Sequence, residues 1–436
     1  MILHGLILRR LSDWLSHLSW LEVALLLTGT MLVDCPRYAL ARVVMVTIDF
    51  AKDLWNWLCG RGDKEQFDHC PSICVILAGY NEGDSVARAI ESLIGAYPRL
   101  EIIVIDDGSA EEHSMVEYAR PYGKKYDNIL VLARPERGGK SSAMNFALPY
   151  TRAEIVITVD CDSSLDDAAL WECVQYFKDP EVGAVSATVF SRNPYVNLCT
   201  WMQAYEYLHA IFTGRMVAER FGILGITSGA FACLRREAVE RTLGWNVGPG
   251  EDLDLTMRIR HLGYKVKCAP YADCLTDVPI KWRQLWRQRL RWEEASVVRT
   301  HCRKHIDMAN PTKASFRWSN FFVSFELITV NLVFGYVILI YSAWLCVNKP
   351  YHALFVAFTF YVYTLVLELI NVLTLTYYSR TKLAHLATCF VLPLSPFYQL
   401  FLIANRIVSY TREIFWRTSF KDNFVPKHVR DVTWKW

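Results

Sequence analysis

Carboxylates gather at three places in the first two-thirds of this chain. Asp106-Asp107 and Asp160-Cys161-Asp162 follow short β-branched runs, and Glu251-Asp252 follows the glycine-rich stretch Gly248-Pro249-Gly250. Two carboxylates spaced like Asp160 and Asp162 can hold Mg²⁺ or Mn²⁺, whose other ligands would be diphosphate oxygens and water. Such an ion offsets the charge that develops on a departing diphosphate. Solvated turns contain the same spacing, so this pair alone does not decide the chemistry.

The other two acidic pairs also have two interpretations each. Asp106-Asp107 stands where a strand-end carboxylate could bind a base or a ribose, but an ordinary βα-turn also uses Asp-Gly. Lys140, after Gly138-Gly139, would add a cation near the same edge. Carboxylates at a helix start are favoured by the helix dipole, which explains Glu251-Asp252 without any function. The functional alternative makes Asp252 a general base beside a substrate hydroxyl.

The stretch Gln288-Arg289-Leu290-Arg291-Trp292 joins polar and aromatic groups on one helix. Positions three and four apart share a helix face, so Gln288, Arg291 and Trp292 can act together. Arg291 could grip a phosphate, and Trp292 offers a flat surface for a sugar ring. Trp282 and Trp286, one turn apart on the same helix, are better explained as anchors in a lipid headgroup region.

Strand-like and helix-like segments alternate from about residue 70 to residue 275 and must position these groups. Strands are predicted at 73–78, 100–105, 129–133 and 155–159, and helices at 82–97, 114–122 and 253–262. This alternation predicts an α/β domain with a mostly parallel, Rossmann-like sheet covered on both faces. Ligands of such sheets bind beyond the carboxyl ends of the strands, where the first two acidic pairs stand.

The composition indicates a protein with a charged part in water and an apolar part in a lipid bilayer. Hydrophobic residues make up 53% of the 436 residues, yet charged residues reach 21%. The net charge of +3 gives no indication of nucleic-acid binding. The 13 cysteines lack the spacing of a zinc site, so we interpret them as reduced, with Cys161 and Cys233 in the core.

Apolar segments flank the α/β region. We predict a transmembrane helix at 15–33 without a cleavable signal peptide, and an interface helix at 39–58. Segments 321–347 and 351–378 are long enough to cross a bilayer. Segment 383–410 is broken by Pro393-Leu394-Ser395-Pro396, which predicts a kinked pair of segments or a re-entrant hairpin, with one straight span as the alternative.

Charge predicts the topology of a multi-pass protein of the inner or plasma membrane. The α/β domain, the Arg380/Lys382 loop and the basic tail should all be cytoplasmic. Polar residues inside the spans (Glu326, Asn331, Glu368 and Asn371) should face a cavity or hydrogen-bond to another helix. The chain is expected to divide into N-terminal helices (1–60), a catalytic domain (61–275), interface helices (276–318), transmembrane spans (319–410) and a tail (411–436).

In their order, these motifs resemble the series that marks membrane-integrated, processive family 2 glycosyltransferases, such as hyaluronan, chitin, cellulose and poly-N-acetylglucosamine synthases. The resemblance covers roughly residues 70–300. The motifs that carry it are Ala78-Gly79-Tyr80-Asn81-Glu82, Asp106-Asp107-Gly108-Ser109, Gly139-Lys140-x-x-Ala143-x-Asn145, Asp160-x-Asp162, Gly250-Glu251-Asp252 and Gln288-x-x-Arg291-Trp292. Ala78 replaces the family's usual proline, and Gly250 replaces its usual threonine.

The resemblance implies a GT-A fold, a UDP-sugar donor and inversion at the anomeric carbon. From their positions in the motifs, the residues expected to bind the donor are Tyr80, Glu82, Asp106, Asp107, Lys140, Asp160, Gln288 and Arg291. Asp160 and Asp162 would bind the metal, Asp252 with Glu251 would carry catalysis, and Trp292 with Asp252 would meet the acceptor. Residues 415–419 faintly resemble the loop that closes over the nucleotide in polymer synthases.

Three functions follow as hypotheses. The first is a processive synthase that uses UDP-glucose, UDP-N-acetylglucosamine or a similar donor, extends a β-linked polysaccharide and passes it across the bilayer. The second is transfer of one sugar to a lipid such as ceramide or a polyprenyl phosphate. The third, an inactive scaffold or export partner, is disfavoured because every acidic motif position is present. The expected partners are the donor, the growing polysaccharide, the bilayer and, as a possibility, a second copy of the chain or an export protein.

Overall fold

The computed structural model describes residues 39–60, 67–313, 316–422 and 425–433. The transmembrane helix expected at 15–33 lies outside these residues. Eight strands form one sheet in the catalytic region. They are β1 (Ile73–Gly79), β2 (Leu100–Asp106), β3 (Ile129–Ala133), β4 (Ile155–Val159), β5 (Ser164–Leu165), β6 (Val182–Ser191), β7 (Phe231–Arg235) and β8 (Lys265–Thr276).

The sheet has the order β3-β2-β1-β4-β7-β6-β8-β5. Strands β1 to β4 run parallel, as expected from the alternation of strands and helices. β7 is antiparallel to both β4 and β6, and β5 is antiparallel to β8, whereas β6 and β8 are parallel. The α/β prediction is confirmed, with a reversed strand in the middle. Because of that reversal, the start of β7 lies beside the end of β4, where Asp160 stands.

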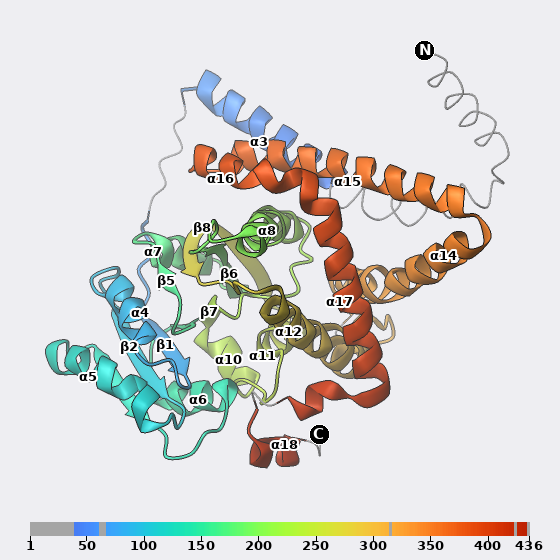
Figure 1. The fold of residues 1–436 in the computed structure, drawn as a ribbon. Coiled ribbons are helices and arrows are strands. Elements are labelled where there is room, and N and C mark those ends of the chain that lie inside the picture. The colour runs from blue at the N-terminus through green and yellow to red at the C-terminus, as the bar shows by residue number, and fades with distance from the viewer. Residues whose placement is uncertain (1–38, 61–66, 314–315, 423–424, 434–436) are drawn as a thin grey trace.

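Helices cover both faces of this sheet (Figure 1). One face carries α4 (Ser85–Leu93), α5 (Met115–Lys125) and α7 (Ala169–Val174), whose apolar residues share a buried cluster with Val75 and Ile157. The other face carries α6 (Lys140–Ala147), α10 (Arg236–Arg241) and α11 (Glu251–His261), packed with Ile76 and Val156. Strands that are buried on both faces carry apolar side chains at every position, so their sequences are continuous apolar runs.

A third buried cluster joins the catalytic domain to the apolar helices. It contains Met45, Met202, Phe212, Leu375 and Tyr398. The elements concerned are α3 (Ala41–Leu58), α8 (Leu198–Tyr207), the π-helical turn Leu208–Thr213, α9 (Gly214–Arg220), α15 (Pro350–Tyr378) and α17 (Ser395–Trp416). α3 meets the C-terminal end of α15 (Figure 1), and Trp55 and Trp57 of α3 are exposed. The helix predicted at 39–58 is therefore present.

The described residues include three helices that are long and apolar enough to cross a membrane: 318–348, 350–378 and 382–416. The first contains α13 (Trp318–Phe325) and α14 (Phe334–Asn348), and the third contains α16 (Lys382–Thr388) and α17. A 3₁₀ turn at Cys389–Leu394 contains Pro393 and changes the direction of the chain between α16 and α17 (Figure 1). This is the kinked pair of segments expected from the two prolines.

Two remaining helices lie beside the catalytic domain. α12 (Trp282–Glu293) continues into the π-helical segment Glu294–His305, and α18 (Lys427–Thr433) follows the turn after α17. α12 packs along α17 through contacts such as Trp282–Phe401 and Trp286–Phe401, with ring centroids 5.4 and 5.3 Å apart. Both tryptophans, predicted as headgroup anchors, therefore also fasten α12 to α17.

Candidate active site

Asp106 and Asp107 end β2, and both carboxylates are engaged by neighbouring loops. Asp106 accepts hydrogen bonds from Ser109 N (2.8 Å), Ser114 Oγ (3.0 Å) and Met115 N (2.9 Å), which fixes the start of α5. Asp107 is 2% exposed and accepts from Arg134 Nη1 (2.7 Å) and from the backbone N–H groups of Gly138 and Gly139. Asp107 thus shapes the loop that precedes Lys140.

Lys140 begins α6 directly after Gly139, whose φ of +88° suits glycine. Its ammonium forms an ion pair with Asp160 and donates to the Gly229 carbonyl at 3.0 Å. Burial would lower the pKa of Lys140, but the charge of Asp160, with Glu251 and Asp252, raises that pKa above its ordinary value. Lys140 therefore stays cationic among three carboxylates from β4 and α11.

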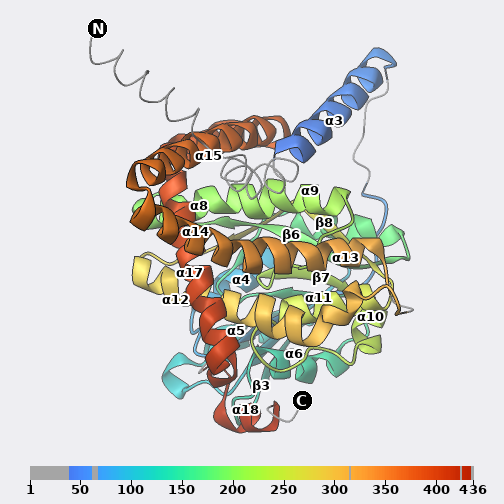
Figure 2. The same cartoon turned by 90° about the vertical axis from the view of Figure 1, so that its right-hand side faces the viewer.

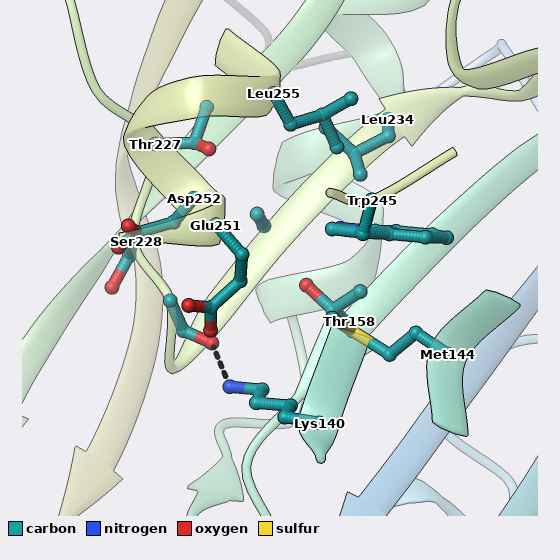
Figure 3. A pocket seen from close by; sticks show the side chains of 12 residues that line it. Lys140, Met144, Thr158, Thr227, Ser228, Leu234, Trp245, Glu251, Asp252 and Leu255 are labelled. Carbon is teal, nitrogen blue, oxygen red and sulfur yellow. Dashed lines mark hydrogen bonds between the residues drawn. The ribbon is translucent and has the colours of Figure 1, made fainter. Parts of the chain in front are cut away.

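A small pocket opens at this point (Figure 3). Its lining comes from α6, β4, β7, the loop that precedes β7, Trp245 and the start of α11. The lining residues are Lys140, Met144, Thr158, Thr227, Ser228, Gly229, Ala232, Leu234, Trp245, Glu251, Asp252 and Leu255. In Figure 3, Glu251 and Asp252 lie on one side of the pocket and Lys140 lies below them.

Asp252, the predicted general base, has a carboxyl whose pKa is raised. Burial and the neighbouring Glu251 raise the pKa of its carboxyl to about 6, against the lowering effect of the Leu253 N–H, Lys140 and Arg215. The Leu253 N–H donates to Asp252 Oδ1 at 2.8 Å. A carboxylate with a pKa near 6 is largely ionised at neutral pH, yet it is a better proton acceptor than an ordinary aspartate.

Asp162 and Glu82 add negative charge next to Asp160. Burial and the charge of Asp160 raise the pKa of Asp162. Burial, followed by Asp162 and Asp160, raises the pKa of Glu82. Carboxylates that disfavour one another's ionisation in this way would be relieved by a divalent cation. The hard oxygen donors of Asp160 and Asp162 therefore fit Mg²⁺ or Mn²⁺, with the remaining ligands left to the substrate and water.

Gly250 caps α11 in a left-handed conformation, with φ of +81°. A Cβ built there would lie 3.2 Å from Thr300 Oγ1 and 3.3 Å from Ala295 Cβ, closer than ordinary contact. The segment that follows α12 thus packs directly on the turn before Glu251. These contacts and the positive φ favour glycine at this position, where the family resemblance led us to expect threonine.

Gln288, Arg291 and Trp292 lie on the last turns of α12 and are not among the lining residues of the pocket. Trp292 is 42% exposed, and Gln288 is partly buried. The structure connects this motif to the pocket through the segment beginning at Glu294, which contacts Gly250. Their donor and acceptor roles remain predictions.

Several residues of the site were not singled out from the sequence. Trp245 forms a wall of the pocket, and Asn145 holds it by accepting from Trp245 N (2.9 Å) and donating to Trp245 O (2.7 Å). Asn145 belongs to a quoted motif, so its spacing from Lys140 was the available signal. Arg137 places its guanidinium 3.9 Å from the centre of the ring of Tyr80, one of the residues predicted to bind the donor.

Comparison with known proteins finds a matching family model, several relatives and a similar solved structure. Residues 74–243 match the family model described as glycosyl transferase family 2, so the chain carries a family 2 glycosyltransferase domain. The resemblance drawn from the motifs is confirmed. A mannosyltransferase from Pyrobaculum calidifontis, solved with GDP-mannose and Mn²⁺, has a similar fold: the TM-score is 0.57 at 20% identity, over 89% of this chain and 99% of that one.

Two relatives are poly-β-1,6-N-acetyl-D-glucosamine synthases. The protein of Staphylococcus epidermidis strain ATCC 35984 is 27% identical over 291 residues, which cover 65% of this chain and 68% of that one. The protein of Staphylococcus aureus strain MSSA476 is 27% identical over 277 residues, which cover 63% and 65%.

Proposed function

We propose that this protein is an inverting glycosyltransferase of the membrane that transfers sugar from a UDP-sugar to the growing end of a β-linked polysaccharide and passes the polymer across the bilayer. The observation that carries the proposal is that the partly buried Asp252 carboxylate faces the same pocket as Lys140. The synthase relatives favour UDP-N-acetylglucosamine as the first donor to test.

The reaction assigns a separate task to each side of the pocket. Asp252 takes the proton of an acceptor hydroxyl as its oxygen attacks the anomeric carbon of the donor. The bond from that carbon to the diphosphate oxygen breaks, and UDP leaves. Attack from the face opposite the leaving group converts an α-linked donor into a β-linked product. Lys140 places positive charge where negative charge develops.

Asp160 and Asp162 would hold Mg²⁺ or Mn²⁺, which when bound offsets the charge of the diphosphate. Tyr80 and Glu82 stand at the nucleoside side of the same sheet edge. The engagement of Asp106 and Asp107 by their own loops supports a role in shaping the donor site. Gln288 and Arg291 would bind the diphosphate of the donor, and Trp292 would stack on the terminal sugar of the acceptor.

The full-length protein in detergent or nanodiscs tests the proposal. We expect UDP release from UDP-N-acetylglucosamine or UDP-glucose in the presence of Mn²⁺ or Mg²⁺, with products of several sugars by mass spectrometry. Asp252→Asn should lower the rate by about 10²- to 10⁴-fold, whereas Asp127→Asn, exposed on the domain surface, should leave the rate unchanged. A product with one sugar on a lipid would contradict chain elongation, and full activity of Asp252→Asn would contradict the assignment of the base.

A further inference from the structure

The arginine that the Gln288-x-x-Arg291-Trp292 motif leaves unspecified is buried at the centre of a polar cluster. Arg289 is 6% exposed, and its Nη2 donates to Glu206 Oε2 at 2.8 Å. The same Glu206 oxygen accepts from the Tyr398 hydroxyl at 2.6 Å. These three residues come from α12, α8 and α17, so the cluster lies where the catalytic domain meets the apolar helices.

Arg289 also lies against Trp292. The guanidinium carbon is 4.3 Å from the centre of the Trp292 ring and 5.9 Å from that of Tyr207. Arg289 and Trp292 are three positions apart and so share a face of α12. Since Trp292 is 42% exposed, one part of its indole is held by a cation while another part remains open to solvent.

A planar guanidinium fixes an indole differently from a compact ammonium. It stacks on the ring through both charge and shape. Arg289 is itself fixed, because Glu206 supplies the countercharge of a largely buried ion pair and Tyr398 restrains the same carboxylate oxygen. The orientation of the indole therefore depends on groups from three helices.

We propose that Glu206, Arg289 and Tyr398 are positioning residues that set the plane of Trp292 for the acceptor sugar. The inference rests on the proposed function, in which Trp292 stacks on the terminal sugar of the acceptor. In addition, Tyr398 makes the orientation of Trp292 depend on α17. A displacement of α17 relative to α8 would therefore change acceptor binding. The donor pocket, which none of the three residues lines, keeps its geometry.

The test separates acceptor use from donor chemistry. Arg289→Lys, Arg289→Met and Tyr398→Phe are compared with wild type for the acceptor KM, using a β-linked N-acetylglucosamine tetramer, and for UDP release into water without acceptor. Arg289→Met should raise the acceptor KM roughly tenfold, while UDP release into water stays within about twofold of wild type. Arg289→Lys keeps the charge but loses the planar stack, so its KM should lie in between.

The matched control is Arg287→Met, the same substitution at an exposed position of α12, for which both readouts should equal those of wild type. Tyr398→Phe removes one hydroxyl and should give a smaller rise in acceptor KM, which keeps the test open if Arg289→Met does not fold. An unchanged acceptor KM in Arg289→Met, full restoration by lysine, or an equal loss of both readouts would overturn the positioning role. A wild-type protein that releases no UDP from either donor would instead refute the proposed function.

Discussion

The aspartates of this site stand in similar local sequences, but they differ in their hydrogen-bond partners. The oxygens of Asp106 and Asp107 are taken by nearby N–H groups, a serine hydroxyl and an arginine. Asp252 accepts from the Leu253 N–H and faces an open pocket. A carboxylate saturated with local donors supports a loop, whereas a carboxylate with spare accepting capacity beside a pocket is suited to take a proton.

The raised pKa of Asp252 predicts how activity depends on pH. The base works only when ionised, so kcat/KM for the donor at fixed, saturating acceptor should fall as the pH drops through about 6. Lys140 lowers the pKa of Asp252 by its charge, so Lys140→Met should move this acidic limb to higher pH in addition to weakening donor binding.

The measurement is initial UDP release between pH 5 and pH 9 in buffers of constant ionic strength. Lys125→Met, an exposed lysine far from the pocket, serves as the control and should keep the wild-type limb. A limb near pH 4 in wild type, or one that moves to lower pH in Lys140→Met, would contradict the electrostatic role given to these two residues.

For individual residues, the sequence allowed the acidic positions of the site to be predicted, but not the side chains that contact the site residues. Asp160, Asp252 and Trp292 stood out through residue type and local spacing. Asn145 and Trp245 are 100 positions apart, and Arg289 and Glu206 are 83 positions apart. Such pairs depend on how helices dock, and no local pattern encodes that docking. The sequence showed Gly250 as a departure from the threonine of the resembled family, but its proximity to Ala295 could be seen only in the structure.

Among the elements, the four parallel strands were predicted within a residue of their observed ends. Their apolar runs are continuous and end in acidic or turn residues, which makes both the strand and its boundary visible. β6, β7 and β8 were not assigned individually, and the reversal of β7 leaves no trace in periodicity. The helix expected at 82–97 is shorter, Ser85–Leu93: it starts after a turn in which Gly83 has a φ of +53°, and it ends where Ile94 is extended and Gly95 has a φ of +77°.

The end of α17 is held to the π-helical segment Glu294–His305 by a buried carboxylate. Glu413, 0% exposed, accepts from Arg303 Nη1 (2.7 Å) and from Ser419 N (2.8 Å). Glu413→Gln removes the charge that balances Arg303, whose side chain is 30% exposed and therefore partly solvated. We expect a loss of about 2 kcal/mol in the free energy of unfolding, less than for a fully buried pair.

Thermal unfolding in detergent, followed by tryptophan fluorescence, measures this effect as a lower Tm. Glu117→Gln, which breaks an exposed ion pair with Arg120, is the matched control and should change the Tm little. If Glu413→Gln had the same Tm as this control, the ion pair would not stabilise the attachment of α17.

In the whole molecule, the contacts of the apolar helices restrict how the chain can cross a membrane. The loop after α15 returns to the catalytic domain, because Arg380 forms an ion pair with Glu172 at 2.8 Å. The tail after α17 returns as well: Pro426 lies beside Gly139, and His428 pairs with Glu136 at 3.5 Å. A third straight crossing would separate the tail from this domain.

The polar residues of α15 also face the catalytic domain. Glu368 accepts from Tyr205 of α8 at 2.9 Å and from Asn371 at 3.0 Å. For this pair, the structure shows hydrogen bonding between and within helices, one of the two alternatives that the sequence left open. Tyr205, one position before Glu206, thus joins α8 to α15 in the same region where Tyr398 joins α8 to α17.

These contacts predict that α13–α14 and α15 cross the bilayer as a hairpin while α16–α17 returns along the catalytic domain. The turn between α14 and α15 projects away from that domain (Figures 1 and 2). In a Cys59→Ser/Cys346→Ser background, Asn348→Cys should react with a membrane-impermeant maleimide in intact cells. Lys427→Cys should react only after the membrane is opened, because the tail lies with the catalytic domain. Labelling of Lys427→Cys in intact cells would show that α16–α17 crosses, and protection of Asn348→Cys there would show that the hairpin does not.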